Sequence, residues 1–239
     1  MNKTLLALLI CFAGIQTAVL QAQEFQVGLK GGINKTFGGQ ITGIASTPDY
    51  TDETFNAEGE IGFHGGLWTQ VSFGKFFIRP EVVYSMLKSR FDFPQGPALY
   101  EVEELSVPIL VGYNIFGPID IYAGAAYKNI MDATIERLEP ITDPPQVVVQ
   151  NSPLSAQIGA KVEFGSFGLD IRYDRALATK EPQRGVDFVS DNANFDIPVL
   201  NRADIDDARL NQLIVSLTIK LFDSENAGKK RRRGGNCYF

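Results

Sequence analysis

Residues 154–164 read LSAQIGAKVEF, and this stretch decides the fold because apolar and polar side chains alternate along all of it. The residues of one parity are Leu154, Ala156, Ile158, Ala160, Val162 and Phe164, and those of the other are Ser155, Gln157, Gly159, Lys161 and Glu163. Successive side chains of a β-strand point to opposite faces. The alternation therefore predicts a strand with one apolar and one polar face.

Seven further segments alternate in the same way, which gives eight predicted strands. These segments are residues 25–34, 60–73, 76–91, 100–115, 119–132, 167–177 and 210–222. The mature chain has no run approaching the roughly 18 to 20 apolar residues that a membrane-spanning helix needs. We therefore expect any membrane crossing to be made of strands.

The connections between the predicted strands alternate in length. The short ones, rich in turn formers, lie near residues 74, 117–118 and 165–168, and the longer, polar ones cover residues 38–59, 92–99, 133–153 and 178–209. Alternation within strands also fits a soluble sandwich, but short turns at one end and long loops at the other are typical of outer-membrane barrels. We predict an all-β fold, an eight-stranded antiparallel up-and-down transmembrane β-barrel, with extracellular loops and both termini in the periplasm.

The N-terminus has the layout of a secretory signal peptide, which we assign to residues 1–22. It holds one cation, Lys3, then an apolar run over residues 5–14 and a zone of small residues that ends at Ala22. Lipidation of Cys11 is not expected, because the residue before it is isoleucine where a small residue would be required.

Two parts remain after the signal peptide. Residues 23–222 form the predicted outer-membrane barrel domain, and a mature length of about 217 residues suits a single β domain. Residues 223–239 form a predicted periplasmic tail. Lysines and arginines fill positions 229–233, so we expect this tail to be disordered and solvated.

Composition excludes several function classes. The formal net charge is −6 and the body of the chain has no basic face, so we expect no nucleic-acid partner. Cys237 is the one cysteine beyond the predicted signal peptide, which excludes an intramolecular disulfide and a cysteine metal cluster. His64 is the single histidine, and we expect hydrogen-bonded inward filler rather than a catalytic set or a histidine metal cluster.

The polar faces of the predicted strands carry charges of both signs. The inward cations are Lys30, Arg79, Lys128, Lys161, Arg172 and Lys220, and the inward anions are Glu81, Glu104, Asp120, Glu163, Asp170 and Asp174. Eight strands enclose an interior just wide enough to be filled by side chains, and buried charges persist only when they pair. We expect a structural ion network. The alternatives are a selective channel or proton path, and a hydrolase that uses Glu81, Glu104 and Glu163 as acid and base.

Three local features carry further expectations. Pro80 and Pro108 lie inside predicted strands, where we expect local bulges because proline has no N–H to donate. Phe222 is the better candidate for a strand-terminal aromatic residue, although it falls on the inward parity. Acidic clusters at residues 49–58 and 187–207 could attract calcium, but the calcium-loop pattern is absent and a solvated anionic surface is expected.

Five phrases of the sequence lie on the predicted strands. They are FQVGLKGGIN at 25–34, GFHGGL at 62–67, IRPEVVYS at 78–85, LSVPILVGY at 105–113 and IYAGAAY at 121–127. Together they resemble the small outer-membrane β-barrel proteins of Bacteroidota, the PorT-like group often labelled porin-family or outer-membrane barrel-domain proteins. The resemblance covers nearly all of the mature chain and implies a barrel in the outer membrane. The family offers no catalytic motif, although one member is associated with type IX secretion and gliding.

We therefore expect a non-enzymatic integral outer-membrane barrel that serves as a structural or accessory subunit of an envelope assembly, with a secretion machine as one such assembly. The alternative is a small channel or a barrel that binds hydrophobic ligands. No catalytic residue, cofactor or metal is expected. The expected partners are outer-membrane lipid and, through the basic tail, other envelope proteins or cell-wall material.

Overall fold

The computed structural model describes most of the predicted barrel domain. The described residues are 24–45, 51–94, 96–135, 138–140, 153–177, 183–190, 200, 202–207 and 210–224. The predicted signal peptide and residues 225–239 of the predicted tail, including Cys237, lie outside these residues.

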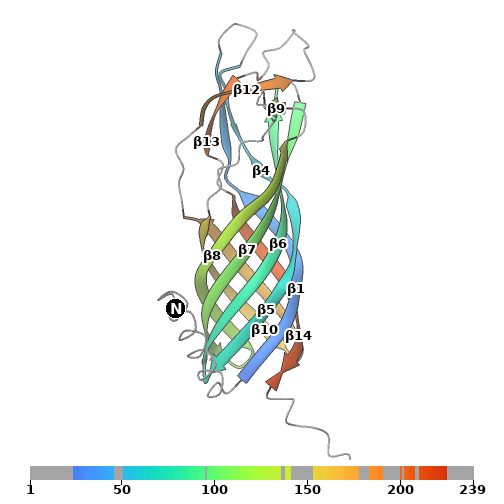
Figure 1. Cartoon of the computed structure of the whole chain (residues 1–239), viewed down its shortest axis with the longest axis vertical. Helices are drawn as coiled ribbons and strands as arrows, with labels where there is room; N and C mark the ends of the chain where they lie inside the picture. Colours follow the sequence, from blue (N-terminus) through green and yellow to red (C-terminus); the bar gives the residue numbers. More distant parts are fainter. Residues whose placement is uncertain are drawn as a thin grey trace, which may run out of the picture.

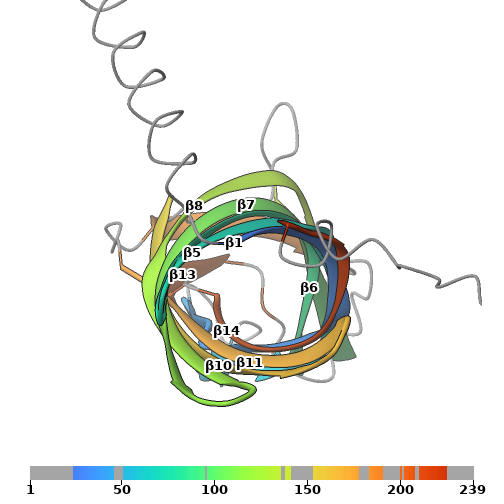
Figure 2. The same cartoon turned by 90° about the horizontal axis from the view of Figure 1, so that it is seen from below.

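Eight strands pair side by side in a closed ring, as the view from below shows (Figure 2). They are β1 (Glu24–Phe37), β5 (Ile61–Phe73), β6 (Phe76–Phe93), β7 (Gly96–Phe116), β8 (Ile119–Ile135), β10 (Leu154–Phe164), β11 (Phe167–Ala176) and β14 (Asn211–Asp223). Neighbouring strands are antiparallel, and β1 closes the ring by pairing with β14. Closure leaves no free edge in the ring. The predicted eight-stranded up-and-down barrel is confirmed.

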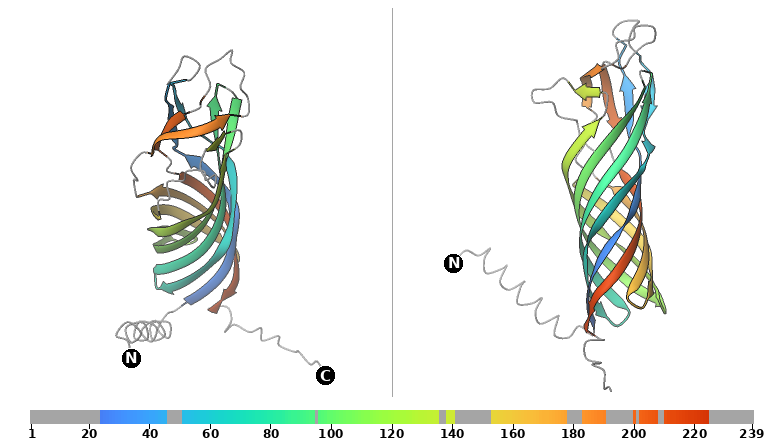
Figure 3. Two further views of the ribbon diagram at one scale, coloured as in Figure 1. Left: turned by 45° about the horizontal axis from the view of Figure 1, so that its top comes forward. Right: turned by 90° about the vertical axis from the view of Figure 1, so that its right-hand side faces the viewer.

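The two ends of the barrel differ (Figures 1 and 3). At the lower end in Figure 1, which we call the turn end, residues 74–75, 117–118 and 165–166 join consecutive strands. Each of these turns begins with a glycine whose φ lies between 52° and 65°, a conformation that side chains disfavour. β1 begins and β14 ends here, where Gln26 pairs with Asp223. We call the opposite end the cap end.

A second sheet of five strands lies at the cap end (Figure 1). Its order is β3 (Thr54–Asn56), β2 (Gln40–Gly43), β13 (Arg202–Asp207), β12 (Gln183–Ser190) and β9 (Leu138–Pro140), while β4 (Glu58–Gly59) pairs with β6. The prediction of continuous loops over residues 38–59, 133–153 and 178–209 is therefore wrong at these strands. The strands are short, and the pairings of β13 with β2 and of β12 with β9 join different connections, so no local alternation signals them.

The predicted long link at residues 92–99 is also wrong, because β6 and β7 continue through it as paired strands. Phe93 pairs with Gly96 at the tip of this extension. Leu87 and Phe91 are buried on its inner face, whereas the inward residues nearer the turn end are mostly polar. The alternation thus continues, but here the apolar residues point inward and the charged residues outward. A strand identified by its apolar outward residues is therefore predicted to end too early.

The extension and the cap sheet share an apolar core. The buried members of this core are Ile41, Leu87, Phe91, Phe93, Ala98, Tyr100, Val102, Leu200, Ala203 and Leu210. Phe55 of β3 packs edge-on against Phe93, with ring centroids 5.1 Å apart. On the outer face of the extension, Arg90 pairs with Glu58 at 2.8 Å. The cap end is therefore built like a soluble domain, apolar inside and charged outside.

A belt of exposed apolar side chains surrounds the barrel between its two ends. On β6 the apolar outward run extends from Phe76 to Met86, and the next outward residue is Lys88. With a rise of about 3.3 Å per residue and a tilt of about 40°, this run covers about 25 Å of the axis, the height of the apolar band of outer-membrane barrels. Among the described residues, no helix is long and apolar enough to cross a membrane.

Aromatic side chains mark both margins of this belt. Exposed aromatic residues toward the turn end include Phe73, Phe76, Phe116, Phe164 and Phe167. Those toward the cap end include Phe37, Phe63, Tyr84, Tyr127 and Tyr173. Aromatic girdles at both membrane interfaces are typical of transmembrane barrels. The belt is therefore a lipid-facing surface with two margins.

The expected bulges at Pro80 and Pro108 are absent. Pro80 pairs with Ile109 and Pro108 pairs with Ala126, in register with the pairs around them. Proline cannot donate to the ladder, and the β6–β7 ladder has no pair between Pro80 and Val83. The prolines therefore remove ladder pairs without shifting the strands.

Phe222 points outward, contrary to the inward parity read from the sequence. Val27 pairs with Phe222, but Gly28 pairs with Lys220, so the ladder shifts by one residue between them. This bulge turns Phe222 to the outer face, where it is 47% exposed and its ring centroid lies 6.3 Å from that of Phe25. The shift arises in the pairing with β1, so it could not be predicted from the alternation within β14 alone.

Candidate functional site in the barrel lumen

The inner face of the barrel carries every charged residue that the sequence predicted to point inward. Ten of the side chains are buried, and Glu163 and Lys220 are half-buried. Each one lies in an ion pair. The predicted structural ion network is confirmed, and we call this set of six cations and six anions the lumen network.

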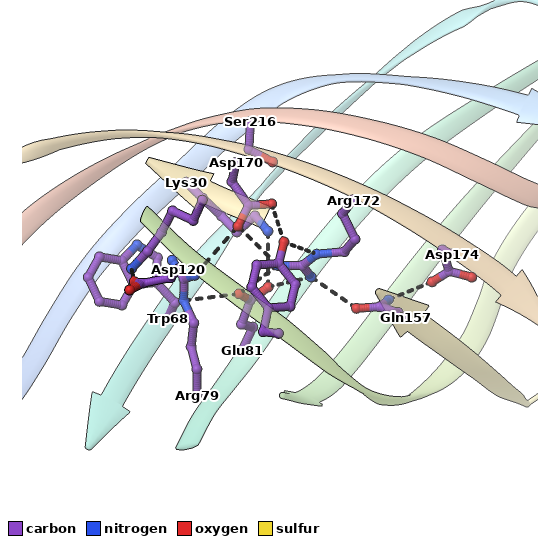
Figure 4. Close-up of polar contacts among 12 residues, drawn as sticks. Lys30, Trp68, Arg79, Glu81, Asp120, Gln157, Asp170, Arg172, Asp174 and Ser216 are labelled. Atoms are coloured by element: carbon purple, nitrogen blue, oxygen red, sulfur yellow. Dashed lines mark hydrogen bonds and ion pairs between the residues drawn. The ribbon is translucent and has the colours of Figure 1, made fainter. Parts of the chain in front are cut away.

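Glu81 of β6 lies at the centre of the lumen network (Figure 4). The Arg172 guanidinium donates two hydrogen bonds of 2.9 Å to its two carboxylate oxygens, and Lys30 Nζ lies 3.0 Å from Oε2. Arg79 Nε lies 3.3 Å from Glu81 Oε1, and Arg79 Nη1 lies 3.5 Å from Asp170 Oδ2. These contacts join β6 to β1 and β11 across the lumen. A bidentate arginine–carboxylate pair is among the strongest polar contacts in proteins.

Two aromatic side chains complete the centre of the lumen network. The Arg79 guanidinium lies over the Trp68 indole, 4.7 Å from the ring centroid, and the indole N–H donates a 3.0 Å hydrogen bond to a backbone carbonyl of β1. The Tyr122 hydroxyl donates to Asp170 at 2.7 Å and accepts from Arg172 Nε at 3.1 Å. Trp68 shares the parity of His64 and Tyr122 that of Asp120, so the alternation places both side chains inward, but nothing in the sequence indicated these contacts.

A second group of the lumen network lies toward the cap end. Lys128 Nζ lies 3.3 Å from Glu104 Oε1 and 3.0 Å from Asp174 Oδ1. Gln157 Nε2 donates to Asp174, and Gln212 Nε2 donates to Glu104 at 3.3 Å. Gln157 thus binds Asp174 Oδ2, which the ammonium group leaves available, whereas Gln212 and Lys128 share Glu104 Oε1.

A third group lies toward the turn end. Lys161 Nζ lies 3.3 Å from Asp120 Oδ2 and also pairs with Glu163. Lys220 Nζ lies 3.2 Å from Glu163 and 3.5 Å from Asp223. The central group has one cation more than anions and the second group one anion more than cations, so charge is compensated over the six cations and six anions of the lumen network taken together.

Side chains fill the lumen between these groups. Trp68, Phe77 and Tyr122 are at most 4% exposed. Each of these side chains packs directly against a glycine of a neighbouring strand, in space that the Cβ of any larger residue would occupy. The glycines are Gly28, Gly112 and Gly159. A cavity of about 10 Å³ lies beside the second group, which is about the space of one water molecule. The described strands therefore enclose side chains rather than an open path.

His64 also lies inside the barrel, as predicted. Its Nε2 is 2.8 Å from the Ser216 hydroxyl, and the ring is 7% exposed. The contact matches the expectation of a hydrogen-bonded inward side chain.

The geometry offers little for the alternative chemistries. Glu81, Glu104 and Glu163 each form an ion pair with one or more cations on the inner face of the barrel. In the part of the chain that the structure describes, no three histidine, cysteine or acidic side chains gather as a metal site would require. Described acids of the long connections pair with arginines instead.

A comparison with protein-family models agrees with this architecture. The family model described as "Outer membrane protein beta-barrel domain" matches residues 21–179. Among solved structures, the chain is similar to OmpT, an outer membrane protein of Vibrio cholerae, with 14% identity and a TM-score of 0.24. That match covers 82% of this chain and 51% of the other, so the chain spans about half the length of OmpT. No curated protein matches the chain.

Replacing Glu81 tests the centre of the lumen network. In a Glu81→Gln variant three buried cations face the single carboxylate of Asp170, so we expect the free energy of unfolding to fall by about 3–5 kcal/mol. Urea unfolding of the barrel in lipid vesicles, followed by the fluorescence of the one tryptophan, Trp68, measures this change. The matched control is Glu58→Gln, because Glu58 pairs with Arg90 on the outer surface and should contribute less than about 1 kcal/mol. Equal losses in the two variants would contradict a special role for Glu81.

Proposed function

We propose that this chain, which belongs to the outer membrane protein beta-barrel domain family, is a non-conducting and non-enzymatic barrel that serves as a structural or accessory subunit of an envelope assembly. Family membership places the barrel in the outer membrane. The observation that supports a non-conducting role is the filling of the lumen by compensated charges and buried aromatic side chains, and the cavity beside the second group has room for about one water molecule. A channel or a ligand-binding barrel would need a continuous cavity.

The proposed orientation places the cap end outside the cell and the turn end in the periplasm. Long connections at the extracellular end and short periplasmic turns are general in outer-membrane barrels. The apolar core and charged outer face of the cap end suit an aqueous environment beyond the membrane. β1 begins and β14 ends at the turn end, so the tail that follows β14 would lie in the periplasm.

The cap sheet supports a role in protein contacts because it is a folded platform. Across its outer face, Thr42 donates a 2.6 Å hydrogen bond to Asp206, and Arg184 donates a 2.5 Å hydrogen bond to Asp204. The Arg184 hydrogen bond, together with the backbone N–H of Gly185, lowers the pKa of the Asp204 carboxyl. The pair is therefore ionised at neutral pH and is lost only as the pH falls through that lowered value.

The basic tail is the proposed attachment to other envelope components. Five consecutive cations at residues 229–233 attract anionic partners such as cell-wall material or an acidic segment of another envelope protein. A secretion machine is one assembly of this kind, and the PorT-like resemblance of the strand phrases is what supports it.

Planar-bilayer recording tests the non-conducting role. The folded barrel should give no discrete current steps. A Glu81→Ala/Arg172→Ala variant should give them, because it removes both members of the central bidentate pair. A Lys88→Ala/Glu101→Ala variant, which removes a pair on the outer surface, should stay silent. Steps in the unmodified protein that change in an Arg79→Glu variant would contradict the proposal.

Cysteine labelling tests the orientation. In a Cys237→Ser background, Asp92→Cys at the cap end should react with a membrane-impermeant maleimide on intact cells. Lys75→Cys at the turn end is also exposed, and it should react only after the outer membrane is permeabilised. The reverse order of labelling would show that the barrel is inserted the other way round.

Affinity isolation tests the proposed assembly. Cross-linked envelope proteins should co-purify with the full-length barrel and be lost on deletion of residues 225–239, which leaves β14 intact. Replacing the five cations at 229–233 by glutamine should cause the same loss if the attachment is electrostatic. Equal recovery of the partners from all three proteins would remove the tail from the proposal, and recovery of none from the full-length barrel would contradict the accessory role.

A further inference from the structure

Almost every cation that the structure describes lies in an ion pair. Lys35, Lys75 and Arg175 differ, because each is exposed and has no carboxylate partner among the described residues. Lys75 lies alone in a turn at the turn end, near the Tyr113 ring. The other two lie close together on the outer wall of the barrel.

Lys35 and Arg175 flank β14. Lys35 of β1 pairs with Leu213 of β14, and Leu213 pairs with Tyr173 of β11. Arg175 is the next outward residue after Tyr173. Adjacent strands lie about 4.8 Å apart, so β1 and β11 are about 10 Å apart across β14, within the combined reach of the two long side chains. We call Lys35, Tyr173 and Arg175 the rim patch.

The rim patch lies near the cap-end margin of the lipid belt, and the outward residues directly beyond its cations, Phe37 and Leu177, are exposed as well. On β1, Lys35 follows the exposed Ile33, and on β11, Arg175 follows the girdle residue Tyr173. The outward residues of the three strands toward the turn end are apolar or glycine, and the exposed ones include Leu29, Ile33, Leu217, Ile219, Leu169 and Ile171. Both cations therefore stand at headgroup level, above a surface that acyl chains cover.

Another part of the same margin has a different charge balance. On β6, Lys88 pairs with Glu101, and Arg90 pairs with Glu58 at 2.8 Å. Those cations are neutralised by the protein itself. Among the described residues no carboxylate neutralises Lys35 or Arg175, and a cation at this level meets the phosphates of lipid headgroups.

We propose that the rim patch binds the phosphorylated headgroup of a lipid whose acyl chains lie on the belt below it. Two features argue for a lipid: the patch is continuous with the lipid belt, and its uncompensated positive charge complements phosphate. Arginine and lysine stems can lie along apolar surface while their charged ends reach the headgroup. The lipid-binding proposal uses the proposed orientation only to identify the leaflet that holds the lipid. This is the outer leaflet if the cap end is extracellular.

Native mass spectrometry of the full-length folded barrel in neutral detergent tests the proposal, with diphosphoryl lipid A as the probe. The barrel should retain bound lipid A, and a Lys35→Gln/Arg175→Gln variant should bind it about 25-fold more weakly, since each cation near an anionic surface contributes about a factor of five. The charge-conserving variant Lys35→Arg/Arg175→Lys should bind within a few-fold of the unmodified barrel. Retained heat-modifiable migration in gels confirms that each variant is folded.

Lys75→Gln is the matched control, because it removes an exposed, unpaired cation from the opposite end of the barrel. It should leave lipid A binding unchanged, and lipid A without phosphates should bind the unmodified protein as weakly as it binds the double variant. Equal binding by the unmodified barrel and the double variant would overturn the proposal, as would full competition by millimolar inorganic phosphate, which would indicate a site for the free anion. A reversed cysteine-labelling pattern would change the leaflet and the proposed orientation, but it would leave this binding result intact.

Discussion

Compensation of buried charge is the constraint on which this barrel depends. An eight-stranded ring excludes bulk water from its interior, so an inward charge is tolerable only beside an opposite charge held by another strand. Glu81 meets this condition with cations from β1, β6 and β11 at once. Because the inward charges pair with one another inside the barrel, the outer side is free to be apolar throughout the belt. The lumen network therefore does for this protein what an apolar core does for a soluble one.

The long strands β6 and β7 have apolar outward residues in one part of their length and charged outward residues in the other. Within the belt Ile78 points outward and Arg79 inward, whereas beyond it Arg90 points outward and Phe91 inward. The change lies near Met86, where the outer surroundings pass from lipid to water. β6 and β7 thus connect the polar interior of the barrel to the apolar interior of the cap end. The cap end is therefore built on strands that also cross the membrane.

Local periodicity explains which features were predictable from the sequence. The alternation over residues 154–164 gave the bounds of β10 as the structure has them, and the parity of Lys30 and Asp170 was enough to place both inside. Features that depend on a distant partner escaped prediction. One of the two partners of β2 is β13, more than a hundred and fifty residues away, and the outward turn of Phe222 depends on a shift against β1. The contact of Arg79 with an aromatic ring likewise depends on the register of two strands, which composition does not contain.

The weakest part of the backbone ladder coincides with the densest part of the lumen network. Pro80 cannot donate to β5 and Pro108 cannot donate to β6, and ladder pairs are missing beside both residues. Within lipid a lost backbone hydrogen bond is costly, because water cannot replace it. Arg79 and Glu81, the neighbours of Pro80, reach across the lumen to β11 and β1, so side chains hold β6 where backbone bonds are fewest. The lumen network therefore stabilises the barrel strands as well as filling the lumen. Breaking it to open a pore would also remove the side-chain contacts that hold β6, the strand with missing backbone pairs beside Pro80.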